Sequence, residues 1–356
     1  MARAAELPAD LRPVARGLEF VRADELAEGL WCLRLPLPYL PTPSVNVYLL
    51  ALDDGYCLVD CGTSLEPGWE ALEHGLELAG ARPQDIRRLV CTHLHADHAG
   101  LAATIVARTG CTLLRGLGPH TVDDLLRDPV ISLAQRREAA RREGVPEEVV
   151  DRWVDTHLAD DVHHERARAD RLLADGDVLE TRAGRWRVVT IPGHSPTQIA
   201  LVEERGRWAI TADLAYDVTA PFLEYGWTLD PYGEHLASIA RIAALEPRAL
   251  LPGHGRPVEH GAARLTAAGR AAKALATDAV AALDCPRTAY ELTARAVPDP
   301  EENNRRQSML STSLCVLEHL EARGKVASER GDDGVRRFNR LPQRADRQRF
   351  SKAAPT

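Results

Sequence analysis

The chain has 356 residues, with 44 Lys and Arg against 52 Asp and Glu, a formal net charge of -8 and a hydrophobic share of 45%. This length allows one large domain and a small one, and the hydrophobic share is ordinary for a globular protein. The negative charge argues against a surface built to bind nucleic acid. We also expect no signal peptide and no membrane span, because no basic start precedes an apolar run and no long apolar stretch occurs.

The cysteines indicate the compartment. There are seven of them, an odd number, and no two form a Cys-x-x-Cys pair. A disulfide framework is therefore not expected, and a reducing, cytoplasmic location is the prediction.

Two β-rich segments stand out along the chain. In the first, apolar runs at 46–51 and 56–60 are separated by Asp-Asp-Gly and predict a hairpin; a helix at 67–79, a strand at 87–92 and a helix at 99–109 follow. In the second, we predict strands at 186–191, 199–202, 208–211 and 249–251, with a helix at 232–245 before the last. Two such halves predict an α/β fold of two packed sheets flanked by helices, in a catalytic domain over residues 18–264.

Two further regions differ in character. Residues 120–170 are polar with a helical pattern, and we interpret them as an insertion that is either a lid, with Trp153, Leu125 and Leu126 as its apolar contacts, or a plain helical layer. Helices predicted at 288–296 and 303–323, followed by a Gly-Asp-Asp-Gly turn, are typical of a winged-helix-like unit over 287–340. Residues 341–356 are expected to be a mobile basic tail.

The strongest chemical signal is a cluster of ligand-type side chains after the strand at 87–92. His93, His95, Asp97 and His98 fall within six residues. Residues two apart in extended backbone point the same way, so His93 and His95 can converge on one ion. Asp97 and His98 follow the turn and can face a second ion. Imidazole and carboxylate suit zinc and related divalent metals.

Three more candidates follow later strands. His194, Asp213 and His254 each come directly after a predicted strand, on loops that a rigid sheet would position. Small residues such as Gly193, Gly253 and Gly255 accompany the two histidines. Core packing explains such a set poorly, because buried unpaired Asp and His side chains cost free energy unless a metal or hydrogen bonds compensate them.

In this order, the motifs resemble those of the metallo-β-lactamase superfamily: His-x-His-x-Asp-His, a lone His, a lone Asp and a final His. The resemblance covers about residues 18–264 and implies an αβ/βα sandwich with the metals at one edge. It also implies a division of the ligands: His93, His95 and His194 for the first metal; Asp97, His98 and His254 for the second; and Asp213 as the bridge. Asp60 resembles the family's upstream aspartate, which supports the metal loop and is usually not a ligand.

These residues predict a dinuclear hydrolase that cleaves a small ester, thioester or lactone by a metal-bridging hydroxide. Asp97 is the candidate that orients the nucleophile and takes its proton. Tyr216, three residues after Asp213, resembles a tyrosine that some lactonases use to hold the substrate carbonyl; an ordinary packing role is the alternative. The commonest zinc β-lactamases have a cysteine near the second ion, where this chain has Asp213. In this respect the chain is similar to the glyoxalase II and lactonase-like branch.

Other functions stay open. The same metals could serve an RNase or phosphodiesterase, although the short separation between Asp213 and His254 leaves no room for the extra domain of the RNA-cleaving members. A mononuclear iron enzyme of the persulfide dioxygenase type, or a regulator acting through the winged helix, are further alternatives. We expect two zinc ions, with iron or manganese as alternatives, and a small acyl substrate. No nucleic-acid or membrane partner is expected, and a homodimer stays open. Since every predicted ligand precedes Ala282, the metal site is expected to form without the residues that follow.

Overall fold

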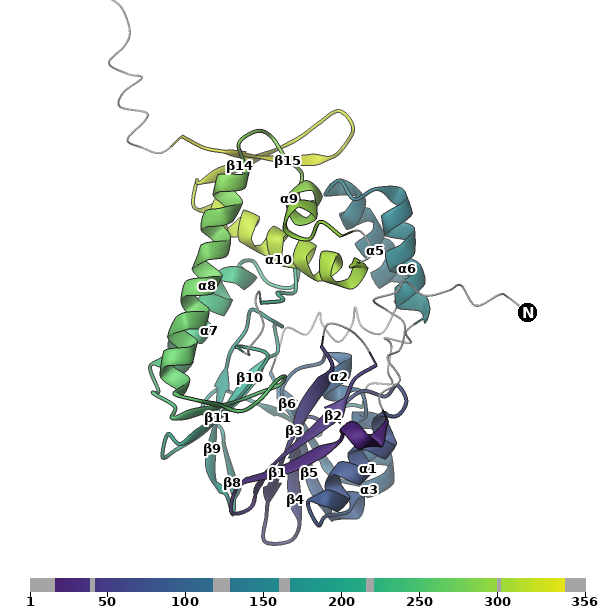
Figure 1. The fold of residues 1–356 in the computed structure, drawn as a ribbon, viewed down its shortest axis with the longest axis vertical. Coiled ribbons are helices and arrows are strands. Elements are labelled where there is room, and N and C mark those ends of the chain that lie inside the picture. Colours follow the sequence, from purple (N-terminus) through teal and green to yellow (C-terminus); the bar gives the residue numbers. More distant parts are fainter. Residues whose placement is uncertain are drawn as a thin grey trace, which may run out of the picture.

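The computed structural model describes residues 17–38, 42–117, 129–159, 167–215, 221–299 and 302–342. The strands form two large sheets and one small one, and the helices lie on the outer sides of the large sheets and above them (Figure 1). Tyr216, Leu125, Leu126 and the tail beyond residue 342 lie outside the described residues.

The first sheet has seven strands in the order in which they occur along the chain. They are β1 Arg22–Ala27, β2 Leu30–Pro36, β3 Ser44–Ala51, β4 Tyr56–Val59, β5 Ile86–Cys91, β6 Thr112–Gly116 and β7 Arg171–Leu173. β1 to β4 are antiparallel, with the predicted hairpin at β3 and β4, and β4 to β7 are parallel. Helices on one face join β4 to β5 and β5 to β6: α1 Gly68–Leu78, α2 Ala96–Ala99 and α3 Ala102–Thr109.

The second sheet has six strands in the order β13-β12-β11-β10-β9-β8. They are β8 Val178–Thr181, β9 Gly184–Thr190, β10 Ile199–Glu203, β11 Trp208–Ala212, β12 Ala249–Pro252 and β13 Val258–Glu259. The parallel pair β11 and β12 is connected by α7 Pro231–Ala243, and α8 Gly261–Ala282 follows β13. Asp230 caps the start of α7 by accepting a hydrogen bond from the Gly233 N–H.

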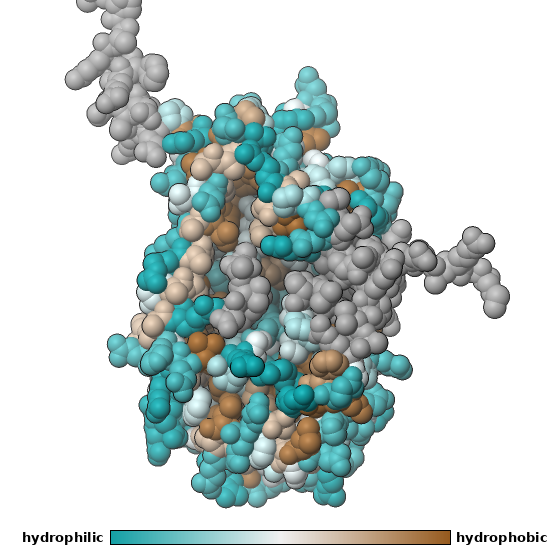
Figure 2. Space-filling view, viewed as in Figure 1, coloured by the Kyte–Doolittle hydropathy of each residue, from teal (hydrophilic) through white to brown (hydrophobic). Residues whose placement is uncertain are grey.

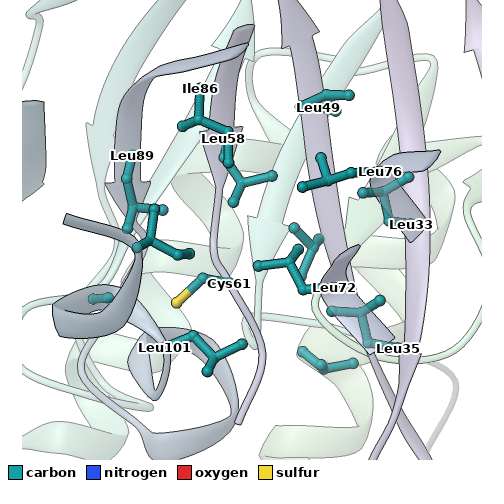
Figure 3. Close-up of a cluster of buried hydrophobic side chains, with 14 of the residues drawn as sticks. Leu33, Leu35, Leu49, Leu58, Cys61, Leu72, Leu76, Ile86, Leu89 and Leu101 are labelled. Carbon is teal, nitrogen blue, oxygen red and sulfur yellow. The ribbon is translucent and has the colours of Figure 1, made fainter. Parts of the chain in front are cut away.

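Three apolar clusters hold these layers together. On the outer face of the first sheet, Leu33, Leu49 and Leu58 pack against Leu72 and Leu76 of α1 (Figure 3). Between the sheets, a second cluster joins both of them; it includes Leu30, Tyr48, Val90, Trp186, Leu201 and Ile210. A third packs the second sheet against α7 and α8; it includes Val189, Ala200, Leu250, Ile239 and Leu265. The predicted arrangement of two sheets flanked by helices is therefore present.

The upper part of Figure 1 contains the remaining helices and the small sheet. These are α5 Pro129–Arg142, α6 Glu147–Ala159, α9 Ala289–Ala296, α10 Asn303–Ala322, β14 Val326–Arg330 and β15 Arg336–Arg340. The order of two helices and an antiparallel hairpin matches the expectation for the C-terminal region, and its assignment as a winged-helix unit stays a prediction.

The insertion and the C-terminal region share one apolar cluster. Trp153 of α6 is buried there with Tyr290, Leu317 and Phe338. The described part of the insertion thus packs on the C-terminal helices, and Trp153 is a core residue of this upper part. The boundary expected at residue 264 falls inside α8, which contacts both α7 and α10.

Among the described residues, no helix is both long and apolar enough to cross a membrane. Hydrophilic residues occupy most of the outline of the face in Figure 2, with hydrophobic residues in smaller groups between them.

Candidate metal centre

The ends of four strands bring the seven predicted ligands together at one edge of the two sheets. β5 of the first sheet leads into the loop and short helix that carry His93, His95, Asp97 and His98. In the second sheet, β9, β11 and β12 precede His194, Asp213 and His254. Side chains that are far apart in sequence thus meet because the sheets pack face to face.

Three imidazoles form the first group. The Nε2 atom of His194 lies 2.9 Å from His95 Nδ1 and 3.3 Å from His93 Nε2, and the latter two atoms are 3.0 Å apart. In a tetrahedral zinc site with Zn–N bonds of about 2.1 Å, two ligand nitrogens lie about 3.4 Å apart. The three nitrogens are therefore close to the spacing that one shared cation requires.

A second group lies beside the first. His98 Nε2 is 3.4 Å from His254 Nε2 and 3.7 Å from Asp97 Oδ2, and the Asp97 oxygen is 3.3 Å from His254. The two groups have no member in common. The structure thus offers two separate sets of three ligand atoms.

Asp213 lies between the two groups. Its Oδ2 is 3.5 Å from His194 Nε2 and 3.3 Å from His254 Nε2, and its Oδ1 is 3.4 Å from His98 Nε2. The Oδ1 atom is buried without a hydrogen-bond partner among the described residues. A buried carboxylate oxygen in this state is costly, and a cation would compensate it. The donor set therefore fits two divalent ions with Asp213 between them.

In each of the five histidines, the ring nitrogen that points away from the cluster contacts an oxygen atom. His194 Nδ1 donates to the carbonyl of Phe222 at 2.9 Å, and His254 Nδ1 donates to that of Ser44 at 2.8 Å. His98 Nδ1 lies 2.8 Å from Asp60, His93 Nδ1 lies 3.1 Å from the Thr92 hydroxyl, and His95 Nε2 lies 3.2 Å from Glu224. Such contacts fix the ring orientation and leave the other nitrogen facing the cluster, as in metal sites generally.

Asp60, directly after β4, is hydrogen-bonded to residues that follow β5. Besides its contact with His98, its carboxylate accepts from the Thr92 N–H at 2.7 Å and the Thr92 hydroxyl at 2.8 Å. Its φ of 62° lies in the left-handed region, which is strained for a residue other than glycine. The carboxylate orients His98 and lies behind the cluster, in agreement with the supporting role that the resemblance implies.

The loop that carries His254 is held by β3. The Asn46 side-chain amide donates to the carbonyls of Pro252 at 2.9 Å and Gly255 at 3.0 Å, and the Tyr48 hydroxyl donates to Pro252 at 2.6 Å. Gly253 leaves no room for a side chain, since a Cβ there would lie 2.3 Å from Asp213 Oδ1. This explains why glycine precedes His254.

Burial and neighbouring charges shift the pKa values of the clustered side chains. Burial lowers the pKa of His194 to about 4 and that of His93 well below its usual value. Burial also opposes charge on His254, but Asp213 and Asp97 outweigh it and raise its pKa to about 10. Burial opposes ionisation of Asp213, yet His254 and His98 hold its pKa well below the usual range. Burial also opposes charge on His95, but Glu224 outweighs it and raises its pKa. In the first group, His93 and His194 thus favour the neutral form and His95 pairs with Glu224, while carboxylates and imidazoles of the second group compensate each other.

The sequence located the seven side chains and one of their supports, Asp60, but not the other supports. Glu224, Asn46 and the Phe222 carbonyl were missed, because nothing near them in sequence resembles a ligand motif. An acidic residue in a turn-rich stretch is the only signal that Glu224 offers. The role of the seven side chains as ligands stays a prediction, although the structure brings all of them together.

Comparison with known proteins identifies the class. The sequence model of the metallo-beta-lactamase superfamily matches residues 40–254, which is more than half of the chain. The chain therefore belongs to this superfamily. The matched segment contains all seven clustered residues, and membership together with these His and Asp groups indicates a metallo-hydrolase.

Individual relatives extend the likeness beyond the matched segment. A probable metallo-hydrolase of Bacillus subtilis, YqjP, is 26% identical over 248 residues, which is 65% of this chain and 73% of that protein. The crystal structure of the metallo-beta-lactamase family protein TTHA1429 of Thermus thermophilus is similar with a TM-score of 0.78 and 26% identity, covering 89% of this chain and 100% of that one. A beta-lactamase domain protein of Burkholderia ambifaria has a TM-score of 0.74 and 26% identity, covering 94% of this chain and 95% of that one.

Proposed function

We propose that the protein is a dinuclear metal-dependent hydrolase of a small ester, thioester or lactone. The observation that carries the proposal is the convergence of two sets of three ligand atoms on either side of Asp213, with every histidine held by an oxygen at its other nitrogen. Divalent ions in these sets, most simply zinc, would polarise a substrate carbonyl and lower the pKa of bound water toward 7.

The exposed atoms of the cluster indicate where a substrate would approach. The side chains of His95, Asp97 and Glu224 are 20–23% exposed, whereas that of His98 is fully buried. Asp97 is thus the carboxylate of the ligand set that solvent and substrate can reach. This supports a role for Asp97 in orienting a water and accepting its proton.

The charge around the exposed side chains His95, Asp97 and Glu224 favours a neutral acyl substrate. Glu224 adds a carboxylate beside His95, and its pKa is held below the usual value because His95 outweighs the effect of burial. Together with Asp60, Asp97 and Asp213, four carboxylates would balance two divalent ions. A site of this kind has little net attraction for the anionic backbone of a nucleic acid, which such enzymes bind through positive charge.

Tyr216 remains the proposed donor to the substrate carbonyl. It follows Asp213 by three residues and lies outside the described residues, so the sequence resemblance alone supports it. Zinc is likewise a proposal, with iron or manganese as alternatives.

The experiment is a substrate panel on purified protein with measured metal content. Thioesters, p-nitrophenyl esters and lactones are compared with bis-p-nitrophenyl phosphate and RNA, each with the wild type and with Asp97→Asn. We expect turnover of at least one acyl class that Asp97→Asn lowers by about 10²-fold or more, in line with the loss of a general base.

Two outcomes would contradict the proposal. Faster turnover of the phosphodiester or RNA would make the nuclease alternative the better description. Oxygen consumption with a persulfide substrate and one iron per chain would instead favour the dioxygenase alternative. Glu70→Gln is the control for the general effect of removing one carboxylate, because Glu70 is exposed on α1 and is not a member of the cluster.

A further inference from the structure

One segment without helix or strand, residues 221–225, lies against the first group of imidazoles. The Phe222 carbonyl accepts the hydrogen bond from His194 Nδ1, and the Glu224 carboxylate faces His95 Nε2 at 3.2 Å. The Glu224 N–H also donates to the His194 carbonyl at 3.1 Å. Two of the three imidazoles in this group therefore take their orientation from this segment.

The segment lacks sheet partners and is held by two hydroxyl side chains of α10. The Leu223 N–H donates to Thr312 Oγ1 at 3.2 Å, and the Thr312 hydroxyl donates to the Pro221 carbonyl at 3.0 Å. The Tyr225 N–H donates to Ser311 Oγ at 2.9 Å, and the Ser311 hydroxyl donates to the Leu223 carbonyl at 2.6 Å. Ser311 and Thr312 thus bind backbone donors and acceptors on both sides of Phe222 and Glu224.

Further contacts fix the same segment to the C-terminal region. The Leu223 side chain is fully buried in the apolar cluster that includes Leu314 and Leu317 of α10. The Tyr225 hydroxyl donates to Glu318 of α10 at 2.6 Å, and Glu318 pairs with Arg336 of β15 at 2.9 Å. The segment is therefore held by α10 over two turns of the helix.

These contacts give α10 a role that the order of ligands along the sequence does not suggest. Every ligand candidate precedes Ala282, which led to the expectation that the site forms without the residues after it. The residues on either side of Phe222 and Glu224 are hydrogen-bonded to Ser311 and Thr312, so residues after 282 contact the segment that supports the first group.

We propose that Ser311 and Thr312 are positioning residues for the His93, His95 and His194 group, acting through Phe222 and Glu224. The inference rests on the proposed function, since it assumes that this group holds a metal ion. Loss of an outer contact to a metal-bound histidine typically lowers metal affinity by 10–100-fold. The second group has its own supports, Asp60 and the Ser44 carbonyl, and neither belongs to α10 or to residues 221–225.

The test compares Ser311→Ala/Thr312→Val with two controls. Thr312→Ser keeps the hydroxyl, and Ser308→Ala removes an exposed hydroxyl one turn earlier on the same helix. Amide hydrogen exchange at Leu223 and Tyr225 in the metal-free protein measures whether the segment is released. A two-step cobalt(II) titration, followed by absorption, measures the affinities of the two groups separately.

We expect the double variant to exchange both amides at least about tenfold faster and to bind at the first group 10–100-fold more weakly. Affinity at the second group should stay near that of the wild type, and both controls should resemble the wild type. If the double variant fails to fold, Glu224→Ala keeps the backbone contacts to α10 and is expected to weaken the first group alone by about tenfold.

Failure of this inference is distinguishable from failure of the proposed function. If the wild type binds two ions and the double variant binds both equally well, the positioning role is wrong while the metal centre stands. Unchanged amide exchange in a folded double variant would also overturn the positioning role. If the wild type binds no metal, both proposals fall.

Discussion

Gly253 offers the sharpest test of the geometry, because an added methyl group would press directly on two predicted ligands. A Cβ at this position would lie 2.3 Å from Asp213 Oδ1 and 2.6 Å from His98 Cε1. Ordinary non-bonded separations are about 3.5 Å, so Asp213 or His98 must move by about 1 Å in Gly253→Ala. The glycine does not have the positive φ that disfavours alanine, so the effect is steric.

A displacement of about 1 Å is large for a catalytic constellation and typically costs about 10²-fold in rate, or roughly 2.7 kcal/mol of transition-state stabilisation. We expect Gly253→Ala to lower kcat/KM by about that factor and to weaken metal binding. Steady-state kinetics on the best acyl substrate and metal titration measure the two effects.

Gly269→Ala is the matched control. Gly269 lies within α8, where a Cβ would make an ordinary contact of 3.4 Å with Ile239. Because alanine favours a helix by about 0.5–1 kcal/mol over glycine, this variant should be active and slightly more stable. A folded Gly253→Ala enzyme with unaltered kinetics and metal affinity would refute the steric argument and the placement of Asp213.

Three other substitutions test separate parts of the account. His93→Ala should abolish turnover and lower metal content, and full activity in the metal-analysed variant would contradict the assignment of the first group. Tyr216→Phe should lower kcat by about 10²–10³-fold with metal content unchanged, because one donor to the developing negative charge is lost; unaltered kinetics would make Tyr216 a packing residue. Trp153→Ala should destabilise the protein by about 3–5 kcal/mol in urea unfolding, since this side chain of α6 is buried against Tyr290 of α9; a loss under 1 kcal/mol would contradict that packing.

Local patterns predicted most of the central strands and the position of the ligands. Each ligand candidate follows an apolar strand, and strand ends are where a sheet edge places side chains, so the convergence of His93, His194 and His254 followed from the order of elements. The helix expected at 99–109 begins later, as α3 at Ala102, and a separate short helix, α2, precedes it. At Gly100, between the two, a Cβ would meet the Ala96 carbonyl at 2.2 Å. The close approach of this turn to the Ser64 backbone requires glycine.

Long-range contacts could not be predicted in the same way. Glu224 lies beside His95 on a segment whose neighbouring residues, Leu223 and Tyr225, donate hydrogen bonds to α10, more than eighty residues later. Helix α8 was not predicted, because its alanine-rich sequence has few large apolar residues to mark a buried face. The shared core of α6 and the C-terminal helices was missed for a related reason: Trp153 and Tyr290 are each compatible with several packing partners until the topology is known.

The central claim is that seven side chains hold two divalent ions, and anomalous diffraction from crystals of the zinc-loaded protein tests it most directly. The account predicts two peaks at the zinc absorption edge, one among His93, His95 and His194 and the other among Asp97, His98 and His254, with Asp213 between them. The absence of peaks at this edge of the sheets, or a single peak at full zinc loading, would contradict the dinuclear centre.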